Sequence, residues 1–179
     1  MNRTTKILLA TFALSFIVMS SALAQDQLAE PLQPFKPFLG KTWKGTFAGS
    51  TPEKPIIDIS RWERALNGQA IRTLHSINNG EYGGESLIFW DKEKQSLAYY
   101  YFTTAGFFTT GTMKFENNKM IAHEYVKGEA GGTTEVQSTA EIMPDGKLIT
   151  KAQYLRNGKW EAGHEVTYVE DASAQVIFK

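Results

Sequence analysis

The chain has 179 residues, carries 19 basic and 19 acidic side chains, and contains no cysteine. Such a balanced charge gives the protein no electrostatic reason to bind DNA, RNA or an anionic membrane surface. The lack of cysteine excludes a disulfide framework, thiol chemistry and lipid attachment at a cleavage-site cysteine.

Residues 1–24 predict a cleavable signal peptide. Arg3 and Lys6 precede an apolar run over residues 7–19, and the small-x-small pattern Ala22-Leu23-Ala24 follows it. The apolar run is shorter than the roughly 20 residues that a membrane-spanning helix needs, and no later segment is longer. We therefore expect an exported protein without a transmembrane segment, periplasmic or secreted, which begins at Gln25.

Residues 25–179 are expected to form a single domain. Cleavage after Ala24 leaves 17 basic and 19 acidic side chains, a formal charge of −2, on 155 residues. This length is typical of one domain with its own core. At its start, Pro31, Pro34 and Pro37 forbid a long helix but allow short helical turns, which predicts a small plug or lid.

Ten short runs rich in Thr, Tyr, Phe, Val and Ile follow, and they predict ten β-strands. Dipeptides such as Asn67-Gly68, Asn117-Asn118 and Asn157-Gly158 supply tight hairpin turns between them. No helical period intervenes, so the sheet is predicted to be antiparallel, and closing it into an up-and-down barrel removes both exposed edges. The predicted strands cover residues 41–48, 56–66, 69–78, 84–90, 96–103, 107–116, 119–127, 133–143, 147–156 and 159–170.

Period-two alternation predicts which side chains line the interior. In the last strand, Glu161, Glu165 and Thr167 mark the outer face. In residues 96–103 aromatic side chains fall on both faces, so alternation does not separate interior from surface there. The candidate ligand-binding residues are His75, Arg72, Tyr99, Tyr101, Tyr154, Trp160, His164 and Tyr168.

Two kinds of side chain among these candidates carry specific chemistry. An inward-turned Arg72 would anchor a ligand carboxylate, whereas on a strand's outer face it would be an ordinary solvated charge. The tyrosines would offer hydroxyl groups to a ligand, or serve only as β-formers. His75, His123 and His164 are spread over the third, seventh and tenth strands with no close-spaced pair, so no metal site is predicted.

The segment from Phe38 to Gly45 resembles the Gly-x-Trp start of the calycins, the lipocalin-like barrels, with two residues between Gly40 and Trp43 where that motif has one. The resemblance implies that Trp43 and Gly40 are structural residues that close one barrel end. Residues 62–72 and 82–91 are similar to a bacterial family of lipocalin-like proteins. The last strand also resembles that of nitrobindin-type barrels, which implies haem binding with His164 as the axial ligand.

The sequence contains no nucleophile elbow, phosphate-binding loop or other catalytic motif. We therefore expect an exported barrel that holds a small apolar or amphipathic molecule, as a monomer or weak homodimer. Two alternatives stay open at this point. One is a haem-binding barrel that uses His164, and the other is a filled barrel that serves as an interaction module for an envelope protein.

Overall fold

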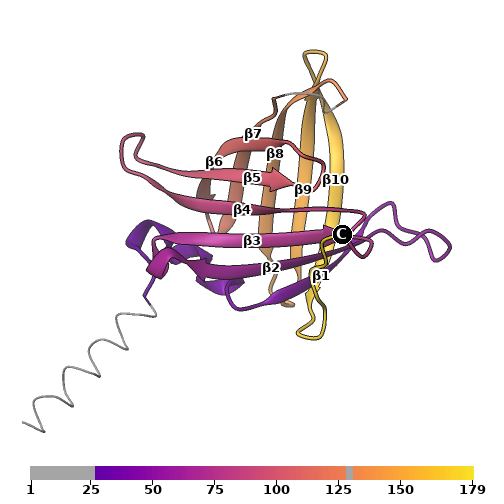
Figure 1. The fold of residues 1–179 in the computed structure, drawn as a ribbon, viewed down its shortest axis with the longest axis horizontal. Coiled ribbons are helices and arrows are strands. Elements are labelled where there is room, and N and C mark those ends of the chain that lie inside the picture. Colours follow the sequence, from indigo (N-terminus) through magenta and orange to yellow (C-terminus); the bar gives the residue numbers. More distant parts are fainter. Residues whose placement is uncertain (1–26, 128–130) are drawn as a thin grey trace, which may run out of the picture.

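The computed structural model describes residues 27–127 and 131–179, so the predicted signal peptide lies outside the described residues. Ten antiparallel strands form one closed barrel, in which each strand pairs with its sequence neighbours and β1 pairs with β10 (Figure 1). The predicted all-β, calycin-like up-and-down barrel is confirmed. The strands are β1 (Thr42–Phe47), β2 (Ile57–Ala65), β3 (Ala70–Ile77), β4 (Tyr82–Asp91), β5 (Ser96–Thr103), β6 (Phe108–Glu116), β7 (Lys119–Tyr125), β8 (Thr133–Ile142), β9 (Leu148–Arg156) and β10 (Lys159–Glu170).

The hairpin turns lie where the sequence predicts them. Asn117 and Asn118 between β6 and β7 have φ angles of 50° and 64°, and Asn157 and Gly158 between β9 and β10 have 49° and 74°. Such left-handed conformations match the twist of the flanking strands and suit Asn and Gly. Short turns of this kind are what forces each strand to pair with the next one along the chain.

A 3-10 helix, η1 (Glu30–Phe38), closes one end of the barrel (Figure 1). Its Leu32, Phe35 and Phe38 side chains are buried. The Phe35 ring packs edge-on against Phe115 of β6 at 4.9 Å, and Phe38 lies 5.1 Å from the ring of Trp62. The predicted N-terminal plug is therefore a densely packed aromatic layer. No helix in the described part of the chain is long and apolar enough to cross a bilayer.

Gly40 and Trp43 join η1 to the barrel. Gly40 has a φ of 69°, and its N–H donates to the carbonyl of Trp62 at 3.0 Å. The Trp43 side chain is completely buried in the same core as the helix. The chain thus leaves the plug through a left-handed turn that glycine adopts without strain.

A β-bulge interrupts β10. The register with β9 shifts between Ala162 and Glu165, so that Gly163 and His164 both lie opposite a single residue of β9. A bulge of this kind reverses the faces on its far side. Trp160 is therefore on the outside, 41% exposed, and its predicted place in the cavity is wrong.

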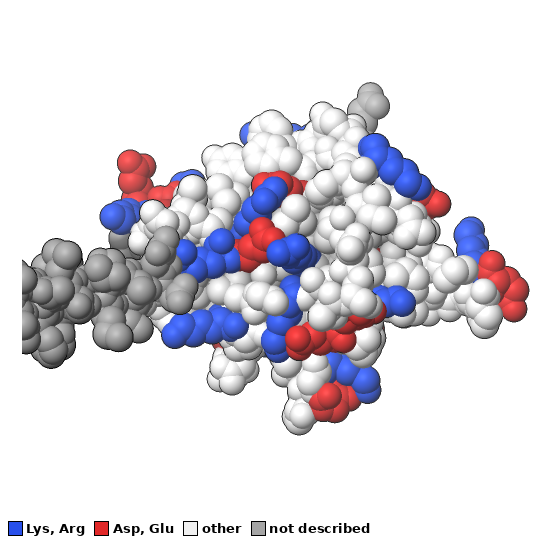
Figure 2. Space-filling model, turned by 60° about the horizontal axis from the view of Figure 1, so that its bottom comes forward, with Lys and Arg blue, Asp and Glu red and all other residues white. Residues whose placement is uncertain are grey.

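The outer surface carries mixed charge. Figure 2 shows basic and acidic side chains interspersed over one face, without a large area of a single sign. Arg72 lies on the outer surface of the barrel, where it pairs with Glu85 at 2.6 Å and with Glu63 at 3.7 Å. Its neighbours on β3, Ile71 and Thr73, point to the interior, so the prediction that Arg72 turns inward to anchor a ligand is wrong.

The C-terminal residues cover the outer face of β3. The N–H of Ile177 donates to the Ser76 hydroxyl at 3.0 Å, and Ser76 is only 1% exposed. The segment forms no strand.

Candidate functional site

The barrel holds an internal cavity of about 540 Å³ in the half opposite the plug. Strands β1 to β10 all contribute to its wall. The apolar part of the wall includes Phe47, Ile77, Met113, Met120 and Val136. The polar part is built mainly from tyrosines and titratable side chains, namely Asp58, His75, Tyr82, Tyr99, Tyr101, Glu124, Tyr154, His164 and Tyr168.

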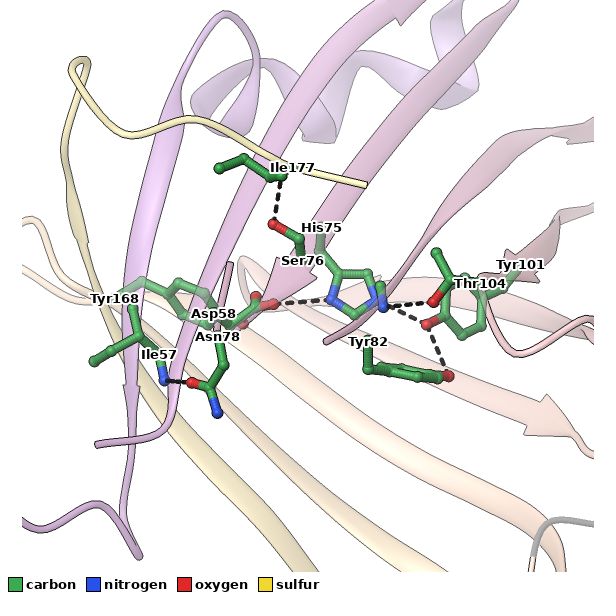
Figure 3. Close-up of polar contacts among 11 residues, drawn as sticks. Ile57, Asp58, His75, Ser76, Asn78, Tyr82, Tyr101, Thr104, Tyr168 and Ile177 are labelled. Carbon is green, nitrogen blue, oxygen red and sulfur yellow. Dashed lines mark hydrogen bonds and ion pairs between the residues drawn. The ribbon is translucent and has the colours of Figure 1, made fainter. Parts of the chain in front are cut away.

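A chain of hydrogen bonds crosses the polar part (Figure 3). The Tyr168 hydroxyl donates to Asp58 Oδ2 at 2.8 Å, and His75 Nδ1 lies 2.9 Å from Asp58 Oδ1. The Tyr101 hydroxyl lies 2.7 Å from His75 Nε2 and 3.1 Å from the Tyr82 hydroxyl. Because a carboxylate only accepts hydrogen bonds, Nδ1 is the protonated nitrogen of His75 that faces Asp58.

Burial decides the protonation of the tyrosines in this chain. It raises the pKa of Tyr168, with the Asp58 charge adding to the rise, and it raises the pKa values of Tyr101 and Tyr82 as well. Desolvation penalises a phenolate, so these hydroxyls stay neutral. They present fixed donors and acceptors to the cavity. Asp58 is itself only 3% exposed, and its two partners satisfy it.

A shared local arrangement positions four of the tyrosines. Each ring lies over a glycine of a neighbouring strand, where a Cβ atom would clash with it. Tyr168 crosses Gly45 and reaches Asp58, which is paired with Gly45 on the other side. The other three pairs are Tyr101 over Gly84, Tyr99 over Gly111 and Tyr154 over Gly163. Because the glycine has no side chain, each tyrosine ring lies along the cavity wall. Its hydroxyl then reaches a titratable side chain beyond the glycine.

Tyr99, Gly111 and Glu124 form one such row across β5, β6 and β7. Burial raises the pKa of the Glu124 carboxyl, and the hydroxyls of Thr109 and Tyr99 offset part of that rise. Burial raises the pKa of Tyr99, and the nearby Glu124 charge adds to that rise. No cation pairs with Glu124 among the residues that the structure describes.

His164 lies at the β10 bulge, where its Nδ1 and the Tyr154 hydroxyl form a hydrogen bond. Its side chain lines the cavity and is also exposed to solvent, and partial burial lowers the pKa of His164. The neutral imidazole is therefore favoured. His164 at the bulge lies on the inner face, whereas Trp160 and Ala162 before the bulge lie on the outer face.

Six of the eight predicted ligand-binding residues line this cavity: His75, Tyr99, Tyr101, Tyr154, His164 and Tyr168. Arg72 and Trp160 do not, for the reasons given above. Alternation leaves the direction of the Tyr99–Phe102 run open, and the structure places Tyr99 and Tyr101 inside and Tyr100 and Phe102 outside.

Sequence reasoning missed Asp58, Tyr82 and Glu124. A signal for two of them was present. Asp58 lies four positions before the apolar Trp62, and Glu124 lies four positions after Met120. Residues an even number of positions apart share one face of a strand, so each acid is on the same face as a buried residue. The third histidine, His123, points away from the cavity and binds Glu135 at 2.6 Å. The described residues contain no cluster of three metal-ligating side chains.

Comparison with known proteins supports the fold. No protein-family model matches the chain, and no curated protein does. Among solved structures, the chain is similar to the crystal structure of Rv2717c from M. tuberculosis, with a TM-score of 0.59 and 15% sequence identity over 81% of this chain and 99% of that one. At this identity the likeness shows a shared barrel fold.

Proposed function

We propose that the protein is an exported binding protein that holds a small amphipathic molecule inside its barrel. The observation that carries this proposal is the internal cavity of about 540 Å³, whose wall is apolar on one part and rich in hydroxyl groups on another. A cavity of this volume lies within the usual range for small-molecule sites. It also favours a carrier over the alternative of a filled barrel that serves only as an interaction module.

The wall favours an amphipathic ligand over a purely apolar one. An apolar molecule would displace water from Tyr82 and Glu124 without replacing the hydrogen bonds, and each unsatisfied buried group costs about 1–3 kcal/mol. A molecule with one polar end satisfies these groups while its apolar part contacts Met113 and Met120.

Export is the second part of the proposal and rests on residues 1–24 of the sequence. Fractionation of the native host tests it directly. We expect the protein outside the cytoplasm, with Gln25 as its first residue in N-terminal mass analysis. A cytoplasmic protein that keeps residues 1–24 would contradict export and leave the binding proposal standing.

A pair of alanine variants tests binding. Ala122 lines the cavity and is 4% exposed, whereas Ala162 is exposed on the outer face of β10. Ala122→Phe is expected to abolish uptake of the neutral fluorescent probe N-phenyl-1-naphthylamine, and Ala162→Phe to leave uptake unchanged. Native mass spectrometry of protein purified from its own host is expected to show a bound small molecule. A wild-type protein with neither probe uptake nor bound molecule would refute the proposal.

Haem binding through His164 is a second candidate, favoured by one observation: His164 faces the cavity with the neutral imidazole that iron ligation requires. The rest of the wall fits haem less well, because none of the described lining residues is a lysine or arginine that would pair with a propionate. Titration with haemin should give a Soret band in the wild type that His164→Ala removes. A spectrum that does not depend on His164 would exclude this candidate.

A further inference from the structure

Glu124 differs from the other acidic group of the cavity because no histidine, lysine or arginine of the described residues pairs with it. Asp58 is bound by His75 and Tyr168, at 2.9 and 2.8 Å. Glu124 lies on the wall formed by β7, and the neighbours that lower its pKa are the neutral hydroxyls of Thr109 and Tyr99. Of the described residues that line the cavity, none is a lysine or arginine.

A buried carboxylate without a counter-charge is unfavourable for the free protein. The fold nevertheless builds a specific surrounding for it. Gly111 is the cross-strand partner of both Tyr99 and Glu124, and its missing side chain lets the Tyr99 ring extend over it toward the carboxyl group. The position therefore combines an unneutralised acid with an aromatic ring held beside it.

Other aromatic side chains of the cavity lie within the field of the same carboxylate. The charge of Glu124 contributes to the raised pKa values of Tyr82, Tyr101 and Tyr154, in each case after the larger effect of burial. Aromatic ring faces attract cations, most strongly where water is excluded. A cation placed here would meet a carboxylate and neighbouring tyrosine side chains, whereas an anion would meet the like charge of Glu124.

We propose that Glu124 anchors the protonated amino group of the ligand, so that the cavity selects small amphipathic amines over neutral and anionic molecules of the same shape. This inference rests on the proposed binding function and specifies its ligand class. The amine supplies the counter-charge that the wall lacks, and the apolar part of the ligand lies against Met113, Met120 and Val136.

Three naphthalene probes that differ only in their polar group test the selection: 2-naphthylmethylamine, 2-naphthalenemethanol and 2-naphthoate. Calorimetric titration of the wild-type protein at about pH 8, above the ordinary carboxyl range, is expected to show the amine binding at least about tenfold more tightly than the alcohol, as a charge-assisted hydrogen bond allows. The naphthoate is expected to bind most weakly.

Glu124→Gln keeps the shape of the side chain and removes its charge. We expect it to bring the affinity for the amine down to that for the alcohol, while the affinity for the alcohol stays within about twofold, since only the charge-assisted part of the bond is lost. The control is Glu116→Gln, an exposed acid at the end of β6 that pairs with Lys114 at 2.6 Å. It should leave all three affinities unchanged.

The outcomes separate this inference from the binding function itself. If the wild type binds the alcohol or the naphthoate as tightly as the amine, the amine selection is refuted while binding stands. This comparison needs no variant and so does not depend on how Glu124→Gln folds. If the amine preference survives in Glu124→Gln, the anchor is another group and the role of Glu124 is refuted. If the cavity variant Ala122→Phe and the wild type both fail to bind every probe, the binding function fails as well.

Discussion

At the scale of single residues, the two acidic side chains of the cavity differ in their hydrogen-bond partners. Asp58 accepts hydrogen bonds on both oxygens, one of them from Tyr168, 110 residues away in the chain. Glu124 has no histidine, lysine or arginine partner among the described residues, and burial raises the pKa of its carboxyl. Buried polar groups without full compensation lower stability, and such costs are expected at functional sites.

The stability of the protein should therefore respond to Glu124 with a definite sign. Because the folded-state pKa of Glu124 is raised, the folded protein holds the proton more tightly than the unfolded chain does. The free energy of unfolding then falls as pH rises from the ordinary carboxyl range through the raised pKa. We expect Glu124→Gln to be more stable than the wild type near neutral pH, with a gain that shrinks as pH is lowered toward the ordinary value.

Urea unfolding of both proteins across this pH range measures the effect, with Glu116→Gln as a control that should show no such gain. A Glu124→Gln variant that is less stable than the wild type at neutral pH would contradict the assignment of Glu124 as an uncompensated acid. So would a gain that grows as pH falls.

At the scale of elements, the tyrosine–glycine pairs position neighbouring strands so that the tyrosine hydroxyls join the hydrogen bonds of the cavity. A Cβ atom at Gly45 would overlap the Tyr168 ring and the Val166 side chain, both of β10. Gly45→Ala should therefore push Tyr168 away from Asp58 and destabilise the protein by about 1–3 kcal/mol, the usual effect of overpacking. Gly49→Ala is the matched control, since an added Cβ there meets no atom within 4 Å.

Thermal and urea unfolding of the two glycine variants provides the comparison. Equal stability of Gly45→Ala and Gly49→Ala would show that the wall accommodates the extra methyl group. The close approach of the Tyr168 ring would then not be a requirement of the fold.

The plug helix η1 is the other element whose packing stabilises the barrel. Phe35 is fully buried between Trp62 and Phe115, whereas Phe108 on the outer face is 52% exposed. Truncating a buried phenylalanine to alanine costs about 3–5 kcal/mol, and a surface change stays within about 0.5 kcal/mol. We expect this difference between Phe35→Ala and Phe108→Ala in urea unfolding, and similar losses in both variants would contradict a structural plug.

At the scale of the whole molecule, the strand pattern was predictable because local signals repeat. Asparagine and glycine pairs mark hairpins, and hairpins force neighbouring strands to pair, so all ten strands and the closed order follow. The bulge at Gly163 and His164 has no such signal, since one inserted residue does not change the composition of a strand. It reverses the face of Trp160, which alternation alone assigns to the cavity.

The candidate site was predictable only in part for a related reason. Alternation identifies inward side chains strand by strand, and in this way it places His75, Tyr154, His164 and Tyr168 in the cavity, while it leaves Tyr99 and Tyr101 open. Contacts between strands depend on register. The meeting of Tyr168 with Asp58 needs β1, β2 and β10 aligned around Gly45, and no local pattern encodes that alignment.

Closure itself depends on the pairing of β1 with β10, where Thr46 lies opposite Thr167 on one side and opposite Ile57 of β2 on the other. Proline has no N–H group, so Thr46→Pro removes one hydrogen bond from this seam and leaves its acceptor unsatisfied, at a cost of about 1–3 kcal/mol. The freed strand edges then offer a template for pairing with a second molecule.

We expect Thr46→Pro to form oligomers in sedimentation velocity runs and to lose probe binding, because the wall residues Phe47, Asp58 and His164 lie beside the opened seam. Thr46→Ala keeps the backbone N–H at the same exposed position and should stay closed and active. A monomeric Thr46→Pro protein with wild-type binding would show that the cavity does not require the seam between β1 and β10. The hydrogen bond from Tyr168 to Asp58 links β10 to β2 across β1. Opening of the barrel between β1 and β10 and loss of binding should therefore occur together.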